Sequence, residues 1–177
     1  IADDIIDASY TSVIFALIAI FLYVAVRFRQ WQFGLGALIA IFHDVVIVLG
    51  LFSLLQGVMP FALEINTAFV AAVLTVVGYS INDTVVVFDR VRERTSLVSS
   101  TSEGINVVVN KALNSTLSRT FNTSMTIIVV LLAIMLFGGS LQSFAFALLI
   151  GVIVGTYSSI CIASPIYTDL VRKNENK

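Results

Sequence analysis

Five long hydrophobic segments separated by polar links dominate the pattern of this chain. They cover roughly residues 8–26, 33–55, 65–88, 120–137 and 144–166. A helix of about 20 apolar residues crosses the hydrocarbon core of a membrane, which is about 30 Å thick. The links are short except for residues 89–118, so consecutive helices are expected to be antiparallel neighbours. The pattern predicts an all-α membrane protein, a polytopic bundle of five transmembrane helices that forms a single transmembrane domain over residues 1–177.

The long link over residues 89–118 contains a second, weaker pattern. Its first half is polar, and in its second half apolar residues recur at helical spacing, at Ile105, Val108, Val109, Ala112 and Leu113. A single apolar stripe is typical of a short helix that lies at a surface. We expect a cytoplasmic loop followed by an interfacial helix, which either contacts membrane lipid or packs beneath the bundle as a connector.

The composition agrees with a membrane protein and excludes several other classes. Hydrophobic residues make up 58% of the chain and charged residues 12%, about half the charged share of a soluble domain. The formal net charge of −1 excludes a basic nucleic-acid binder. The chain begins with Ile1, and Asp3, Asp4 and Asp7 stand where a cleavable signal peptide would be basic. We therefore expect a fragment of a longer protein.

Basic residues lie on one side of the predicted topology. The link after the first span, the link after the third span and the C-terminal tail share a side, and they hold all ten Lys and Arg residues: Arg27, Arg29, Arg90, Arg92, Arg94, Lys111, Arg119, Arg172, Lys173 and Lys177. Basic residues favour the cytoplasmic side. The N-terminus of this chain is therefore expected outside, and the C-terminus inside, a bacterial cytoplasmic membrane.

The last hydrophobic segment has a small residue at every fourth position, namely Gly151, Gly155, Ser159 and Ala163. Small residues at this spacing let two membrane helices approach closely, so this face is expected to pack against another helix. Pro165 is expected near the end of the segment, where a lost backbone hydrogen bond is least costly.

The third hydrophobic segment carries a carboxylate at membrane depth. Asp83 lies about five residues before its cytoplasmic end, and Tyr79 and Asn82 share its helix face. An ionised side chain in hydrocarbon costs roughly 2.5 to 3.5 kcal/mol or more, so such residues usually line a path or a protein interior. Asp83 is the main functional candidate.

Three other membrane-depth groups accompany Asp83. Arg119 begins the fourth span with Thr123 one turn later, and it either snorkels to lipid headgroups or pairs with Asp83. His43 and Asp44 lie near the middle of the second span. His43 is either a neutral histidine bonded to a neighbouring helix or part of a proton relay. Asp44 must be protonated, paired or hydrated.

The sequence lacks the residues that several kinds of chemistry require. It contains no Gly-rich phosphate loop, one cysteine and one histidine, so neither nucleotide hydrolysis, a metal site, nor a Ser/His hydrolase is indicated. We expect no enzyme activity and no cofactor. Two helix arrangements that change the distance between Asp83 and Arg119 would change the proton affinity of the carboxylate, which is the minimum needed for proton-driven motion.

The order of short motifs resembles a known family. Residues 78–90 read GYSINDTVVVFDR, and the chain also has HD at 43–44, SRT at 118–120, FGG at 137–139 and GVIVGTYSSI at 151–160. Together these are similar to the SecF family of bacterial protein-export subunits, within the SecD/SecF group of the resistance-nodulation-division superfamily. The resemblance extends over nearly the whole chain.

The resemblance implies a six-helix bundle of which this chain holds helices two to six, without the first helix and the extracytoplasmic domain. It implies a proton-motive-force-coupled role in Sec-dependent export, with SecD and the SecYEG channel as partners and a preprotein gripped by the missing domain. Asp83 corresponds to the family's proton-path carboxylate and Arg119 to its partner arginine, whereas Asn82, His43 and Asp44 match motifs only. Two other functions stay open: one half of a small-molecule efflux or secondary transporter, and a scaffold subunit whose charges set helix register.

Overall fold

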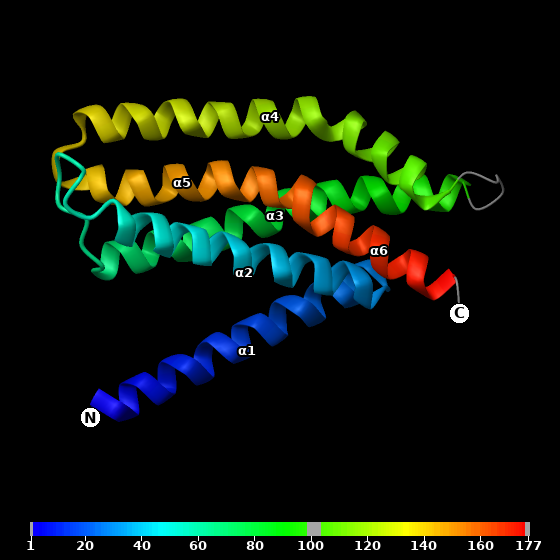
Figure 1. The fold of residues 1–177 in the computed structure, drawn as a ribbon, viewed down its shortest axis with the longest axis horizontal. Coiled ribbons are helices and arrows are strands. Elements are labelled where there is room, and N and C mark those ends of the chain that lie inside the picture. The colour runs from blue at the N-terminus through cyan, green and yellow to red at the C-terminus, as the bar shows by residue number, and fades with distance from the viewer. Residues whose placement is uncertain (1, 99–103, 176–177) are drawn as a thin grey trace.

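The computed structural model describes residues 2–98 and 104–175, with side chains from Phe15 onward. All secondary structure in these ranges is helical, so the predicted all-α bundle is confirmed. The elements are α1 (Ala2–Phe28), α2 (Trp31–Leu54), α3 (Thr67–Val98), α4 (Ile105–Phe137), a 3-10 turn (Gly139–Leu141), α5 (Gln142–Ser158), a π-helical turn (Ser159–Ala163) and α6 (Ser164–Glu175). Helices α2 to α5 lie side by side, and α1 diverges from them toward its N-terminus (Figure 1).

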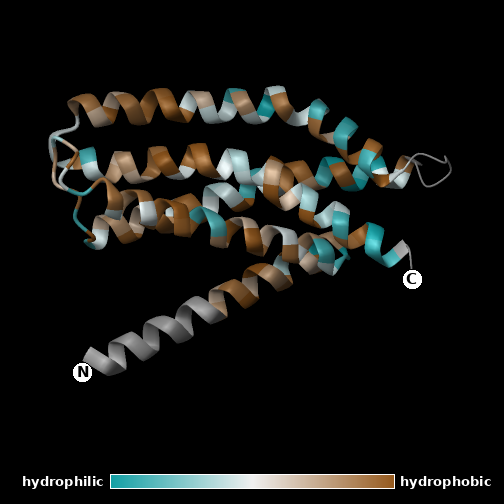
Figure 2. Cartoon of the chain, in the orientation of Figure 1, coloured by the Kyte–Doolittle hydropathy of each residue, from teal (hydrophilic) through white to brown (hydrophobic). Residues whose placement is uncertain are grey.

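Four described segments are long and apolar enough to cross a membrane: Trp31–Leu54, Thr67–Leu97, Ile105–Phe137 and Gly139–Asn174. The described apolar part of α1 is shorter and covers Phe15–Phe28. Hydrophobic residues follow the middle of these helices, and hydrophilic residues gather at the end where α3 gives way to α4 and α6 ends (Figure 2). We call this the basic end, because the described Lys and Arg residues belong to it.

The helix expected at the surface over residues 105–113 is the beginning of α4 rather than a separate element, which corrects the sequence interpretation. Residues 105–137 contain neither Gly nor Pro, so nothing in the backbone interrupts the helix. The buried stripe of Val108 and Ala112 continues through Thr116, Thr120 and Ser124 at steps of four. The polar residues between them lie on the exposed face of the same helix, so their polarity did not mark a loop.

The last span is also longer than predicted. Helix α5, the π turn and α6 follow one another without a gap to Glu175, and together we call them the last rod. Pro165 therefore lies inside this rod instead of at its end. Proline has no N–H to donate, and its ring clashes with the carbonyl four residues earlier. The π turn Ser159–Ala163 directly precedes it and widens the helix at that point. Across the turn, Ser164 Oγ donates a hydrogen bond to the Ser159 carbonyl at 3.0 Å.

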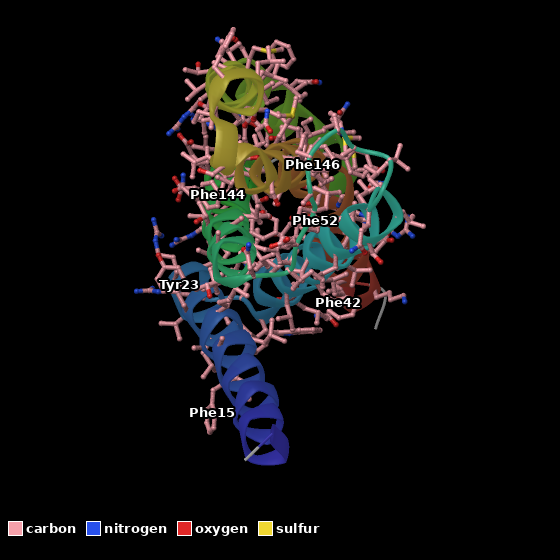
Figure 3. The ribbon with its side chains drawn as sticks, turned by 90° about the vertical axis from the view of Figure 1, so that its left-hand side faces the viewer. Phe15, Tyr23, Phe42, Phe52, Phe144 and Phe146 are labelled. Atoms are coloured by element: carbon pink, nitrogen blue, oxygen red, sulfur yellow. The ribbon has the colours of Figure 1, made fainter. Side chains whose placement is uncertain are left out.

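Aromatic side chains fill both ends of the bundle. At the basic end, Phe33 stacks on Tyr167 with ring centroids 3.9 Å apart, and the Phe33 ring also lies 4.8 Å from that of Phe88. At the opposite end, the Phe52 ring lies 4.3 Å from that of Phe69 and 6.4 Å from that of Phe146. Figure 3 shows Phe15 far out on the diverging part of α1. The two aromatic clusters hold α2, α3 and the last rod together at both ends.

Between these clusters, small residues allow close approach of the helices. A Cβ atom on Gly151 would overlap the side chain of Val76 on α3, and one on Gly155 would lie 3.3 Å from Ser80 Cβ. A Cβ atom on Gly36 of α2 would lie 2.8 Å from the Ala163 carbonyl oxygen. The small face of the last rod therefore lies against α3 and, at the π turn, against α2.

Candidate functional site

A cavity of about 40 Å³ lies between α3 and α4 beside Asp83. Its lining residues come at steps of three or four along each helix, which places them on facing sides; they are Tyr79, Asn82, Asp83, Val86, Arg119, Thr120 and Thr123. The structure thus brings together five residues that the sequence singled out in two separate spans. A water molecule needs roughly 10–15 Å³ of such space, so the cavity is large enough for water and too small for an organic substrate.

The Asp83 carboxylate is buried, with 8% of the residue exposed. The side chains of Thr120 and Arg119 line the same cavity as this carboxylate. Within the described part of the chain, Asp83 Oδ2 and Thr120 Oγ1 are buried without a hydrogen-bond partner. Because an unpaired buried polar atom is costly, these two oxygens are the part of the site that the protein itself leaves unsatisfied.

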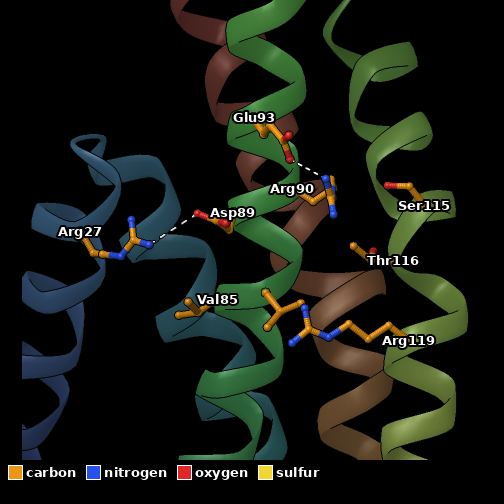
Figure 4. A pocket seen from close by; sticks show the side chains of 9 residues that line it. Arg27, Val85, Asp89, Arg90, Glu93, Ser115, Thr116 and Arg119 are labelled. Atoms are coloured by element: carbon orange, nitrogen blue, oxygen red, sulfur yellow. Dashed lines mark hydrogen bonds and ion pairs between the residues drawn. The ribbon is translucent and has the colours of Figure 1, made fainter.

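Arg119 stands between this cavity and a wider pocket toward the basic end. The wider pocket measures about 210 Å³, and Arg119 and Val86 line both spaces. Figure 4 shows the Arg119 side chain extending from α4 toward α3. In the described residues no ion pair within 4.0 Å joins Asp83 and Arg119, so the pairing considered from the sequence is not a direct contact in this conformation.

Two ion pairs flank the wider pocket. Arg27 of α1 approaches Asp89 of α3 with Nη2 to Oδ1 at 3.6 Å, and Arg90 contacts Glu93 with Nη1 to Oε2 at 2.6 Å (Figure 4). All four side chains are largely exposed, and exposed pairs of this kind contribute about 0–1 kcal/mol. The wider pocket is thus bordered by two ion pairs that cost little free energy to separate.

His43 and Asp44 lie apart from the cavity, in a second buried polar group. Asp44 is 1% exposed, and its Oδ2 accepts hydrogen bonds from Ser80 Oγ of α3 at 2.5 Å and from Ser158 Oγ of α5 at 2.8 Å. Its Oδ1 lies 3.1 Å from His43 Nδ1. Asp44 therefore links three helices at the middle of the bundle.

Hydroxyl groups that the sequence did not single out complete the polar interior. Tyr79 Oη lies 2.8 Å from Ser124 Oγ, which lies 2.6 Å from Thr156 Oγ1. Thr84 Oγ1 lies 2.9 Å from Ser159 Oγ. In a membrane helix such hydroxyls often bond only to their own backbone, so their presence alone does not identify cross-helix pairs.

Comparison with known proteins places this arrangement in context. Residues 1–173 match the family described as "Protein export membrane protein SecD/SecF, C-terminal". The chain is 50% identical over 170 residues to the "Protein translocase subunit SecF" of Rhodothermus marinus, covering 96% of this chain and 54% of that relative. It is 43% identical over 174 residues to the protein of the same name in Rickettsia rickettsii, covering 98% of this chain and 54% of that relative.

The fold is also similar to a solved structure. The "Crystal structure of SecDF in Super-membrane-facing form" superimposes with a TM-score of 0.87 and 41% identity. The match covers 99% of this chain and 23% of the solved one. This chain spans about half the length of the curated relatives it matches.

Proposed function

The chain belongs to the SecD/SecF family of protein-export membrane proteins, and on this premise we propose that it couples the proton motive force to protein export through Asp83. It is a multi-pass membrane component of the SecDF type. In our proposal it acts with SecD and the SecYEG channel to complete preprotein translocation on the outer face of the bacterial cytoplasmic membrane. The preprotein would contact parts of the full-length protein outside this chain.

The observation that carries the proposal is the cavity that holds Asp83 and Arg119 together. Burial disfavours the charged form of a carboxyl group, and a nearby guanidinium favours it. Any movement of α4 relative to α3 changes the distance between the two groups and hence the proton affinity of Asp83. By linkage, binding or release of a proton then favours one helix arrangement over the other.

The wider pocket supports a route for protons from the basic end. It shares Arg119 and Val86 with the cavity, so a small side-chain movement would join the two spaces. The excess of Lys and Arg supports placing this end in the cytoplasm, with the N-terminus of the chain outside. Proton entry or exit on the cytoplasmic side would then pass Arg119.

Exposed polar side chains at membrane depth support a partner on the α3–α4 side. Asn82 and Asn122 are exposed beside Arg119, although polar groups facing lipid are costly. A second protein bundle in contact with this side would remove them from lipid. SecD is the partner we propose, because the solved SecDF chain that matches this fold is more than four times as long as the matched part.

The two alternative functions, a small-molecule transporter and a scaffold subunit, require different features of the structure. A small-molecule transporter needs a binding pocket of about 300–1,000 Å³, and the cavity beside the ionisable residues measures about 40 Å³. A scaffold subunit needs no proton transfer, so a double replacement of Asp83 and Arg119 by neutral residues would leave it active. The size of the cavity therefore argues against the transporter, and the double replacement distinguishes proton coupling from the scaffold.

The test is the Asp83→Asn variant of the full-length protein, assayed with SecD and the channel in energised membrane vesicles. We expect normal membrane insertion and loss of the export stimulation that depends on the proton motive force. Asp169→Asn is the matched control, because Asp169 is an exposed carboxylate whose partner is Arg172 on the same helix. Full stimulation in the Asp83→Asn variant would reject the proposal.

A further inference from the structure

The wider pocket at the basic end brings together arginine side chains from three helices. It lies between α1, α3 and α4, and Arg27, Arg90 and Arg119 line it. We propose that this pocket binds the phosphate group of an anionic phospholipid in the membrane leaflet at the basic end. The inference goes beyond the proposed function, because it concerns a ligand of the wider pocket and does not depend on proton transfer at Asp83.

The depth of the wider pocket matches that of lipid headgroups. Its arginines lie at boundaries between hydrophobic and polar sequence: Arg27 directly follows the first hydrophobic segment, Arg90 follows the third, and Arg119 directly precedes the fourth. Tyr23, one turn before Arg27 on α1, is 58% exposed, and tyrosines are typical of the membrane interface. Headgroups occupy the layer directly outside the hydrocarbon core, so the three guanidinium groups lie in the layer that holds lipid phosphates.

The charges that line the wider pocket favour an anion. Three arginines oppose two carboxylates, Asp89 and Glu93, which leaves an excess of one positive charge. Within the described residues, the guanidinium of Arg119 has neither a hydrogen bond nor an ion pair. A guanidinium carries several N–H donors and binds phosphate through paired hydrogen bonds. A phosphodiester with a single negative charge would therefore neutralise the pocket and provide the partner that Arg119 lacks.

The two ion pairs beside the wider pocket leave arginine donors available to a ligand. The paired atoms of Arg27 and Asp89 are 3.6 Å apart, which is too far for a hydrogen bond. Arg90 contacts Glu93 through Nη1 in the described structure, so its other donors remain available. Because exposed pairs of this kind contribute little free energy, a phosphate can attract both arginines at small cost.

Another pocket at the basic end lacks this excess of positive charge. It measures about 270 Å³ and lies between α4 and α6, with Asp169 and Arg172 as its charged lining residues. These two side chains pair with each other, with Arg172 Nη2 to Asp169 Oδ1 at 3.5 Å. Arg172 is therefore a matched control for Arg90, since each is an exposed arginine that pairs with a carboxylate three residues away on its own helix.

Native mass spectrometry tests the proposal on the full-length protein in complex with SecD, titrated with phosphatidylglycerol. Arg90→Gln should weaken the binding of the most tightly held lipid about fivefold, the factor that corresponds to about 1 kcal/mol for each basic residue near a membrane surface. Arg172→Gln should leave this binding unchanged. Equal weakening in both variants would show a general attraction to the charged end and would overturn the proposal, as would unchanged binding in Arg90→Gln.

A variant with the opposite expected effect separates lipid binding from damage to the fold. Glu93→Gln removes a negative charge from the wider pocket and frees Arg90 from its partner, so it should tighten phosphatidylglycerol binding by a similar factor. Damage to the fold would weaken binding instead. Asp169→Asn is the control and should have no effect, because Asp169 lies outside this pocket. Unchanged or weaker binding in Glu93→Gln would overturn the inference.

Competition distinguishes a lipid phosphate from a free one. Inorganic phosphate at the concentration of the lipid should not displace phosphatidylglycerol, because acyl chains add buried apolar area to the binding. Phosphatidylcholine should bind more weakly, since its choline group offsets the charge of the phosphate. Displacement by inorganic phosphate would identify a site for free phosphate, and equal binding of phosphatidylcholine would remove the role of net charge. Either result would overturn the assignment to an anionic phospholipid.

Discussion

Asp83 and Arg119 line the same cavity of about 40 Å³ without forming an ion pair within the described structure. The carboxylate is buried in α3, and the Arg119 side chain extends from α4 toward α3. A direct pair would hold the carboxylate ionised, whereas a guanidinium at greater distance leaves its charge adjustable by small movements of α4. The separation is therefore a functional property in our proposal.

The first prediction concerns the charge at position 119. Arg119→Met should abolish the export stimulation that depends on the proton motive force, because the cavity beside Asp83 loses the guanidinium that lines it. Arg119→Lys should retain part of it, since Lys keeps the charge and loses the planar fork of donors. The measurement is export into energised vesicles, and equal activity of the two variants would contradict the role of charge.

A second prediction concerns the space between the cavity and the wider pocket. Val86→Phe should reduce proton-coupled stimulation, because the larger ring would fill a cavity of about 40 Å³ that Val86 lines. Leu74→Phe adds similar bulk on the same helix at an exposed position, so it serves as the control. Equal stimulation in the two variants would show that the connection between the spaces is not used.

Much of the cavity could be predicted from the sequence, because its residues follow helical periodicity. Tyr79, Asn82 and Asp83 share a face at steps of three and four, and Arg119 and Thr123 do so on the next span. The partners of Asp44 could not be found in this way. Ser80 and Ser158 lie 36 and 114 residues away from it, and no local spacing relates positions so far apart.

Helix ends were predicted less well for two physical reasons. The polar link over residues 89–118 suggested a separate interfacial helix before the fourth span, but an exposed face of a continuous helix is equally polar. Pro165 suggested an end to the fifth span, but the π turn before it accommodates the missing donor. Composition therefore indicated which residues enter the membrane, whereas the points at which the helices begin and end depended on backbone geometry.

The third prediction concerns the orientation of the chain. A single Ser140→Cys substitution in a variant without Cys161 should be labelled by a membrane-impermeant thiol reagent from outside the cell only. Ser140 is exposed in the turn between α4 and α5, at the end opposite the basic residues. Leu97→Cys at the basic end is the control and should be labelled only after the membrane is opened. Labelling of Ser140→Cys from the cytoplasmic side would reverse the proposed topology.

The fourth prediction concerns the contact between α3 and α5. Gly151→Ala should destabilise the full-length protein by about 1–3 kcal/mol, the usual cost of overpacking, because the added Cβ would overlap Val76. Gly50→Ala on α2 is the control, since nothing lies within 4 Å of an added Cβ there. Unfolding in detergent by denaturant provides the measurement. The double variant Gly151→Ala with Val76→Ala should recover part of the loss.

The last prediction links Gly36 to the π turn. A Cβ atom on Gly36 would lie 2.8 Å from the carbonyl oxygen of Ala163, which ends the π turn. Gly36→Ala should therefore lower the unfolding free energy by about 1–3 kcal/mol. Pro165→Ala removes the cause that we assign to the π turn, so the backbone there can return to α-helical geometry and move the carbonyl.

A double-mutant cycle separates these effects. If the π turn depends on Pro165, Gly36→Ala should cost less free energy in the Pro165→Ala background than in the original protein, with a coupling of about 0.5–3 kcal/mol for positions in contact. Additive costs would show that the position of the Ala163 carbonyl does not depend on Pro165. The π turn begins at Ser159, whose Oγ lies 2.9 Å from Thr84 Oγ1 of α3. A measurable coupling would therefore show that Pro165 fixes the backbone of the π turn, and with it the position of Ser159 beside α3.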